Sequence, residues 1–267
     1  MPNKKHMKTG NGKNQIRLYG KNRKRVAAGK TCYWSDIGQW QSHRQHLTGC
    51  EPVRVNVTSK SANPVFAQLS PMCLGPVRCY EENGRPVTSV NLEVAWQYSK
   101  IYFHIIDNAG QLVDVRNRFL TTDERGNPTP TDEWFRWRDE AFNNPKFDHR
   151  HPDFKSNKKL VRRAFPKGSR VAWWYWDGKL LNAVEARQQI YARLYEQLVS
   201  QQPSYQSLRR LVKQGNDLLL YDFDGYDWQA LDRSPADCVR DLDHSFGHGM
   251  VLAFLLQGIR ASKLSLN

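Results

Sequence analysis

The sequence Leu218–Asp227, LLLYDFDGYD, determines the architecture that we expect, because a short apolar run there meets a cluster of acids. The run Leu218–Tyr221 has the length and composition of a buried strand. The carboxylates of Asp222, Asp224 and Asp227 follow at once, and open α/β sheets bind their ligands at the carboxyl ends of the strands. This order predicts an α/β or α+β fold with a functional site at the end of this strand.

The acidic cluster has three possible roles. Asp222 and Asp224 form a D-x-D pattern that could hold magnesium against a phosphate or a nucleotide-sugar diphosphate. One of them could instead act as a general base, or stabilise an oxocarbenium ion during cleavage of a glycosidic bond. In the third case the Asp-Gly pair is a turn and its acids are solvated. We favour the second role, which needs no metal and no other cofactor.

The flanking sequence predicts strands that alternate with helices. Strands are expected over Pro52–Thr58, where apolar residues alternate, and over the aromatic run Val171–Trp176. Helices are expected over 91–103, 132–142, 182–199, 203–215 and 246–257, the last of them buried. Irregular loops are expected over 69–77 and 121–131. These elements predict a mixed central sheet flanked by helices, in a single domain over residues 31–267.

Positive charge is distributed unevenly along the chain. The 267 residues carry 40 Lys and Arg against 26 Asp and Glu, a formal charge of +14. Residues 1–30 hold ten of these cations and no acid, so they predict a flexible basic arm ahead of the domain. Such an arm would contact phosphates without regard to sequence, or would only aid solubility.

A second concentration of positive charge lies between residues 146 and 170, where nine Lys or Arg accompany two Asp. Aromatic residues lie within it and on both sides. Cations that hold a backbone, together with rings on which bases stack, are typical of proteins that handle opened nucleic acid. The alternative is a solvated face over an aromatic core. The predicted backbone contacts are Lys155, Lys158, Lys159, Arg162, Arg163, Lys167 and Arg170.

His248 is a further candidate, because it lies between Gly247 and Gly249 at the start of the apolar 246–257 helix. Small neighbours and the outward N–H groups of a helix start allow close approach there. An imidazole at this point could act as an acid or base, or bind a phosphate. It could equally be a core histidine.

The 91–103 segment carries a polar stripe of Glu93, Gln97 and Lys100 beside Trp96. These side chains could line a pocket, in which Gln97 would read a base edge through two hydrogen bonds. Trp174 from the aromatic strand is a second ring for holding a base. The alternative for the stripe is a solvent-facing helix surface.

The cysteines and the apolar runs indicate where in the cell the protein is expected. The five cysteines are odd in number and scattered, without a CxxC pair, which favours a reducing, cytoplasmic location without structural zinc. No apolar run approaches the roughly 20 residues that span a bilayer. The N-terminus lacks the apolar segment of a secretory signal. We therefore expect no membrane partner, and nothing in the sequence implies an obligate protein partner.

Five segments together resemble a pattern of uncharacterised bacterial and phage proteins, over about residues 65–257. They are LSPMCLGPV (69–77), NLEVAWQYSKIY (91–102), WYWDGKLLNAVEAR (174–187), LLLYDFDGYD (218–227) and SFGHGMVLAFLL (245–256). Within that group the chain resembles anti-phage DNA glycosylases acting on glucosylated hydroxymethylcytosine. The G-Q-D-P-Y and H-P-S loops of uracil glycosylases are absent. The resemblance therefore implies an activity, and it assigns no catalytic residue.

The function we expect is a metal-independent, base-flipping DNA glycosylase of phage defence, which acts on double-stranded DNA and leaves an abasic site. Asp222 or Asp224 would stabilise the sugar cation or activate water, with His248 as an acid or a phosphate contact. Two alternatives are a nucleotide-sugar or ADP-ribose transferase acting on nucleic acid, and a DNA-binding protein without catalysis. The expected substrate contacts are Glu93, Trp96, Gln97, Lys100 and Trp174.

Overall fold

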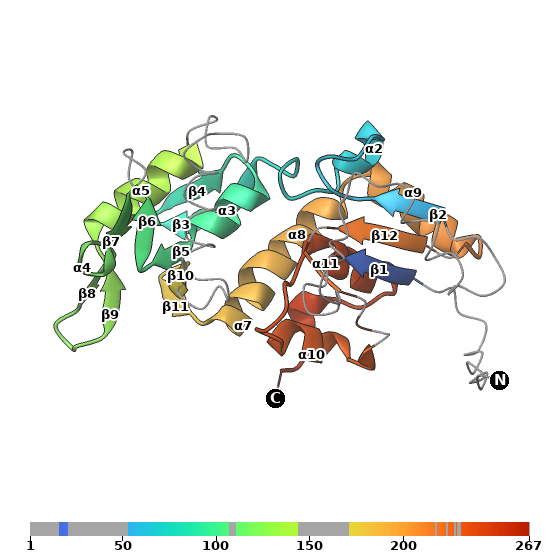
Figure 1. Ribbon diagram of the computed structural model, residues 1–267. Coiled ribbons are helices and arrows are strands. Elements are labelled where there is room, and N and C mark those ends of the chain that lie inside the picture. Colours follow the sequence, from blue (N-terminus) through green and yellow to red (C-terminus); the bar gives the residue numbers. More distant parts are fainter. Residues whose placement is uncertain are drawn as a thin grey trace.

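Short strands in small sheets, flanked by helices, make up the chain in a computed structural model (Figure 1). The structure describes residues 16–20, 53–106, 111–143, 171–216, 218–222, 224–226, 228 and 231–266. Within this part the strands form five separate sheets. The α/β class is therefore confirmed, with small sheets in place of one large one.

The strand predicted from the apolar run is β12 (Leu218–Asp222), and all of its residues are buried. It lies between β1 (Ile16–Gly20) and β2 (Val53–Asn56), and both pair with it in parallel. A parallel strand covered on both faces needs a continuous apolar sequence, which explains the Leu-rich run. The strand at Val53–Asn56 is also as predicted.

β1 falls within the stretch that the sequence assigns to a flexible arm. Its pairing runs from Ile16 opposite Leu218 to Gly20 opposite Asp222. The prediction of a flexible arm is therefore wrong for these residues. The edge of β12 accepts them as a parallel partner strand. The rest of residues 1–30 lies outside the described part of the chain.

Helices cover this sheet. The helices are α2 (Pro64–Ala67), α8 (Arg193–Val199), α9 (Pro203–Lys213), α10 (Pro235–Arg240), α11 (His248–Leu256) and the 3-10 turn η4 (Ala261–Lys263). All residues of α11 are buried, as its uniformly apolar sequence predicts. We call β1, β2, β12 and these helices except α8 the parallel-sheet region.

The other elements form what we call the hairpin region. Its strands are β3 (Val77–Glu82), β4 (Arg85–Ser89), β5 (Lys100–Tyr102), β6 (His104–Ile106), β7 (Leu112–Asp114), β8 (Leu120–Thr122), β9 (Pro128–Pro130), β10 (Val171–Trp176) and β11 (Lys179–Leu181). Its helices are α3 (Leu92–Tyr98), α4 (Arg116–Phe119) and α5 (Asp132–Asn143). β10 is the central strand of a sheet with β5 and β11. The strand at 171–176 and the helix at 132–142 are as predicted.

Two predicted segments differ from the structure. The 91–103 helix ends after Tyr98, and Lys100–Tyr102 is β5, paired antiparallel with β10. Pairing with a distant aromatic strand outweighs local helix propensity there. The predicted 121–131 loop contains the β8–β9 hairpin, whose turn is held by bonds from the backbone N–H groups of Arg125 and Asn127 to the Asp123 carboxylate.

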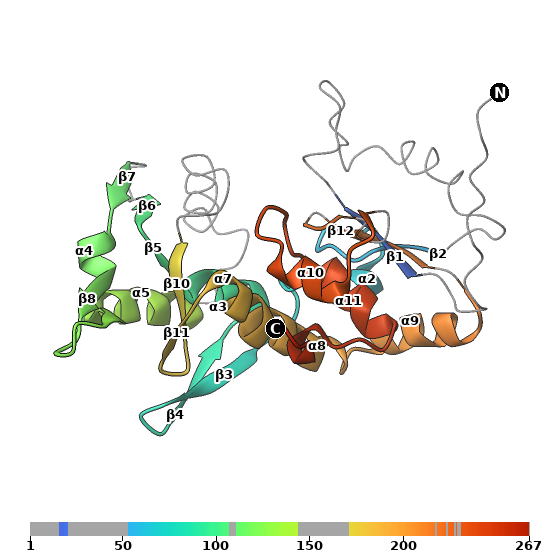
Figure 2. The same ribbon diagram turned by 90° about the horizontal axis from the view of Figure 1, so that it is seen from below.

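One helical rod joins the two regions. It begins with α7 (Ala183–Ala186), where Asn182 and Glu185 form a capping box, and continues through α8 to Val199. Between them the π-helical turn η2 (Arg187–Ala192) inserts one wider turn. In Figures 1 and 2 this rod runs between the green hairpin region and the blue, orange and red parallel-sheet region. The predicted 182–199 helix is confirmed.

The hydrophobic core passes through both regions. One cluster of buried side chains contains Val77 and Trp176 from the hairpin region, Ile190 from the rod, and Leu220 and Phe254 from the parallel-sheet region. Because this core is continuous, the two regions form a single domain. No helix in the described residues is long and apolar enough to cross a bilayer.

Candidate functional site

Asp222 ends β12 and is fixed to the start of α11. Its side chain is almost completely buried, and Oδ2 accepts a hydrogen bond of 2.8 Å from the backbone N–H of Gly249. The first N–H groups of a helix have no partner inside the helix, and the helix dipole favours an anion beside them. Asp222 therefore joins the end of the strand to α11.

Gly247 allows that junction to form. A Cβ atom at this position would lie 1.7 Å from the backbone oxygen of Asp224 and 2.6 Å from Oδ2 of Asp222. The backbone oxygen cannot move away without moving the loop that follows β12. The G-H-G sequence therefore reflects close packing of α11 against this loop, as its small residues indicate.

His248 uses both of its ring nitrogens inside the fold. Nδ1 lies 3.1 Å from Oδ2 of Asp222, and Nε2 lies 2.8 Å from the backbone oxygen of Val57, just after β2. The side chain is buried. The geometry thus gives His248 a role in holding β2, β12 and α11 together, where the sequence predicts an acid or a phosphate contact.

Three carboxylates, on two segments of the chain, act on one buried phenol through their charge. Tyr191, in η2, is buried, and burial raises the pKa of its hydroxyl well above the ordinary value. The negative charges of Asp222, Glu93 and Asp224 raise this pKa further. All three carboxylates therefore lie near the same hydroxyl. The structure brings together the predicted residues of the β12 end and of the 91–103 segment.

Glu93, Gln97 and Lys100 form a hydrogen-bonded chain beside this group. Nε2 of Gln97 donates to Glu93 over 3.0 Å, and Nζ of Lys100 donates to Oε1 of Gln97 over 2.8 Å. The hydroxyl of Tyr102 donates to the same Gln97 oxygen. These bonds fix the amide, so Gln97 cannot offer its oxygen to a base edge as the sequence predicts. It links the ammonium group to Glu93 instead.

Tryptophan rings form the wall next to this chain. Trp96 stacks on Trp174 with ring centroids 5.4 Å apart, and its ring lies 5.1 Å from Tyr191. Nζ of Lys100 lies 4.9 Å from the centre of the Trp96 ring. Trp96 is partly exposed, whereas Trp174 is buried. A base could therefore reach Trp96 but not the far side of Trp174.

Trp174 also carries a buried polar atom. Its indole Nε1 is buried and has no hydrogen-bond partner among the described residues. A buried donor without a partner costs about 1–3 kcal/mol, so such atoms are uncommon outside functional sites.

The segment 241–247, which leads into α11, contains polar contacts that the sequence analysis misses. Asp241 is buried and lies 2.9 Å from an Arg233 nitrogen and 2.5 Å from Nδ1 of His244. The only signal in the sequence is the D-x-x-H spacing of Asp241 and His244. The guanidinium of Arg187 donates to backbone oxygens of this segment, at Asp241 and His244. Burial lowers the pKa of Arg187 to about 10, against the charge of Asp241.

The predicted nucleic-acid backbone contacts fall outside the described residues. This applies to Lys155, Lys158, Lys159, Arg162, Arg163, Lys167 and Arg170. Their predicted role stays a prediction. Within the part of the chain that is described, no group of three or more His, Cys, Asp or Glu side chains is placed to hold a metal ion.

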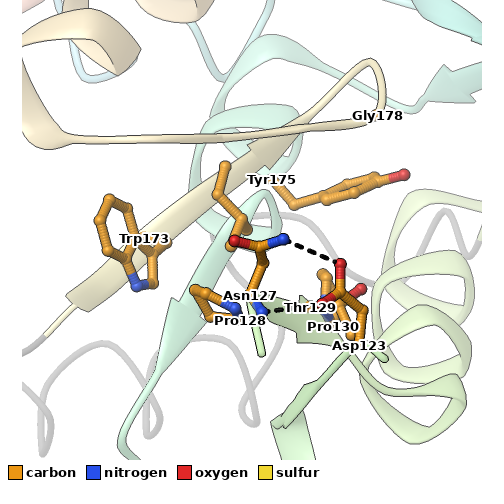
Figure 3. Close-up of a pocket in the computed structure, with 9 residues that line it drawn as sticks. Asp123, Asn127, Pro128, Thr129, Pro130, Trp173, Tyr175 and Gly178 are labelled. Atoms are coloured by element: carbon orange, nitrogen blue, oxygen red, sulfur yellow. Dashed lines mark hydrogen bonds between the residues drawn. The ribbon is translucent and has the colours of Figure 1, made fainter. Parts of the chain in front are cut away.

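A separate hollow of about 380 Å³ lies between the β8–β9 hairpin and β10–β11 (Figure 3). Trp173 and Tyr175 line it, and alternate residues of a strand point to opposite faces, so Trp174 faces away from it. The Asp123 carboxylate in this hollow accepts hydrogen bonds from its own turn, including one from the Asn127 side chain. The hollow is therefore distinct from the group around Tyr191.

Comparison of the chain with family models, with curated proteins and with solved structures gives no match. The site is therefore interpreted from its own geometry.

Proposed function

We propose that this protein is a base-flipping DNA glycosylase, which hydrolyses the N-glycosidic bond of a modified base and leaves an abasic site. The observation that carries the proposal is the gathering of Glu93, Asp222 and Asp224 beside the Trp96–Trp174 stack. Cleavage of this bond develops positive charge on the sugar, which nearby carboxylates stabilise. A base taken out of the duplex needs an aromatic surface in place of its lost stacking.

The three carboxylates differ in what already holds them. Asp222 is bound by Gly249 and His248, and Glu93 accepts a hydrogen bond from Gln97. Asp224 is partly exposed, and it lies on the loop that leaves β12. We assign Asp224 to the sugar cation, and Asp222 to positioning this loop against α11.

The base would stack on the partly exposed Trp96, with Lys100 at its edge. The Lys100 ammonium, which also donates to Gln97, and the indole N–H of Trp174 are both donors at this wall. A base with acceptor atoms on the facing edge suits such a wall. The resemblance to glycosylases acting on modified cytosine agrees with this chemistry.

The test is incubation of the full chain with duplex oligonucleotides that contain plain cytosine or glucosylated hydroxymethylcytosine. Hot alkali is then added to cut abasic sites. Strand breaks that appear only after alkali, and only in modified DNA, support base excision. Breaks without alkali would indicate a nuclease or a lyase, and loss of all activity with a chelator would favour the metal-dependent transferase.

Asp224→Asn should slow excision by about 100-fold or more at unchanged DNA affinity, because it removes the charge that stabilises the sugar cation. The matched control is Asp232→Asn at an exposed position whose left-handed φ of 52° suits asparagine. Rates are measured in single-turnover assays. Equal rates for wild type and Asp224→Asn would contradict this role, and DNA binding without any excision would favour the non-catalytic alternative.

A further inference from the structure

We infer that His244, oriented by Asp241, transfers the proton in the excision reaction. The inference rests on the proposed function and adds to it a residue that neither the apolar runs nor the acidic cluster indicates. It follows from three observations: the pairing of His244 with a buried carboxylate, its second ring nitrogen, and its place beside the loop that carries Asp224.

The pairing fixes the state of the imidazole ring. Nδ1 of His244 lies 2.5 Å from Oδ2 of Asp241, and Asp241 also accepts a hydrogen bond from the hydroxyl of Tyr226. Burial raises the pKa of Asp241, but the hydrogen bond from His244 and the charge of Arg233 lower it, so this pKa lies below its ordinary value. Asp241 therefore stays ionised, and Nδ1 of His244 carries the hydrogen that it accepts.

The second nitrogen distinguishes His244 from His248. Nε2 of His248 is bound to the backbone oxygen of Val57, whereas Nε2 of His244 makes no hydrogen bond within the described residues. The His244 side chain is 14% exposed, so a small molecule such as water can reach it. A ring held at Nδ1 by a carboxylate with Nε2 accessible is the arrangement of a general base.

The segment 241–247 lies against the loop after β12 at two points. The His244 ring packs on the Tyr226 ring with centroids 4.8 Å apart, and Gly247 packs on the backbone oxygen of Asp224. Between these points, the Phe246 ring lies 6.3 Å from that of Tyr191. His244 is thus on the same end of the sheet as Asp224 and the carboxylates around Tyr191.

The proposed step adds one water molecule across the glycosidic bond. The C1′–N bond breaks and its electron pair leaves with the base, while the carboxylate of Asp224 stabilises the sugar cation. The oxygen of water bonds to C1′, and its proton passes to Nε2 of His244. The imidazolium then gives this proton to the departing base, so that His244 returns to its starting state.

The experiment measures single-turnover excision by wild type, His244→Ala and Asp241→Asn on modified duplex DNA, with and without added imidazole. We expect His244→Ala to be slower by about 100-fold or more at unchanged DNA affinity. Free imidazole should restore part of this rate, and Asp241→Asn should lower the single-turnover rate more than it changes the protein concentration that gives half of that rate. The control is His104→Ala, which removes a histidine 3.8 Å from Asp114 in the hairpin region and should excise at the wild-type rate.

The possible results test the role of His244 and the glycosylase proposal separately. If wild type excises the base and His244→Ala does so equally fast, the role of His244 is overturned while the glycosylase proposal stands. A slow His244→Ala variant that imidazole does not rescue, and whose unfolding midpoint has dropped, would also overturn it in favour of a structural role. If wild type excises no base, the glycosylase proposal fails, and this role fails with it.

A second measurement does not depend on activity. Nitrogen-15 NMR of the ring in the free protein should show hydrogen on Nδ1 of His244, with Nε2 accepting. A neutral ring that carries hydrogen only at Nε2 would overturn the assignment, because Asp241 would then not orient the base.

Discussion

The two regions of the molecule each bury ionic groups, and they do so differently. In the hairpin region, the guanidinium of Arg138 is 1% exposed, binds Glu82 over 2.7 Å and donates to the hydroxyl of Tyr80. Burial lowers the pKa of Arg138, but the hydrogen bonds of Glu82 and Asp139 outweigh this and raise it overall. Each contact of this cluster is with another protein group, which is typical of a structural element.

At the end of β12, in contrast, charges of the same sign are gathered. Three carboxylates from two segments act on Tyr191 there, and Trp174 has a buried N–H group without a partner in the described residues. Gathering like charges costs stability, which a fold usually avoids unless a ligand or a reaction uses them. The two regions therefore differ in charge balance: Arg138 is paired with Glu82, whereas the described end of β12 gathers charges of one sign near Tyr191.

The largest expected effect on stability comes from breaking the Arg138 cluster. Arg138→Met leaves Glu82 partly buried without its partner, and such losses cost about 3–5 kcal/mol. Arg136 lies on the same helix, α5, but is exposed, so Arg136→Met should change the free energy of unfolding by under about 0.5 kcal/mol. Urea denaturation of both variants measures the difference. Similar values would mean that the cluster does not support the hairpin region.

Gly247→Ala tests the junction between α11 and the loop after β12. The added methyl group meets the backbone oxygen of Asp224, and overpacking of this kind costs about 3 kcal/mol. The control is Gly258→Ala just after α11, which meets no atom but has a φ of +81°. Its cost should be about 1 kcal/mol, from backbone strain alone. If thermal unfolding gave equal losses, the close approach at Gly247 would be unimportant.

The smallest expected effect is the pH-dependent contribution of Asp241 to the free energy of unfolding. A carboxyl group whose pKa is lowered on folding stabilises the protein above its unfolded pKa, and this contribution disappears as the pH falls through the folded pKa. Asp241→Asn should therefore cost about 2 kcal/mol near pH 7, by weakening hydrogen bonds to a charged group. The difference from wild type should shrink below about pH 4.

Unfolding free energies at a series of pH values measure this difference, with the exposed Asp232→Asn as the control. A difference that stayed constant down to pH 2 would show that Asp241 is not ionised in the folded protein.

The sequence predicts those elements whose signal is local. The apolar run of β12, the uniformly apolar α11 and the capped start of α7 each carry their information within a few residues, and all three are found where they are expected. β5 is missed because its strand conformation depends on pairing with β10, which is about 70 residues away. β1 is missed because the basic composition of residues 1–30 around it hides a strand that pairs with β12.

The candidate site follows the same rule. The acids after β12 are visible as a cluster, and so is the Glu93 stripe, but which of their atoms are occupied depends on contacts between distant segments. His248 bonds to Val57, as the core histidine that the sequence leaves open, whereas Gln97 is buried and accepts from Tyr102, which neither interpretation of the polar stripe predicts. His244 becomes a candidate only in the folded chain, where it bonds to Asp241 and Asp241 also accepts from the hydroxyl of Tyr226.

The wide turn η2 gives the helical rod room to lose one residue. A π-helical turn holds more residues than an α-helical turn, so each of its residues advances by less than the roughly 100° of an α-helix. Removing one residue between Arg187 and Ala192 would therefore convert the wide turn to a regular one and keep α7 and α8 in phase. Removing one residue from the regular turns of α8 would instead rotate the rest of that helix by about 100° and take its buried residues out of the core. Single deletions within η2 should therefore be tolerated better than single deletions within α8.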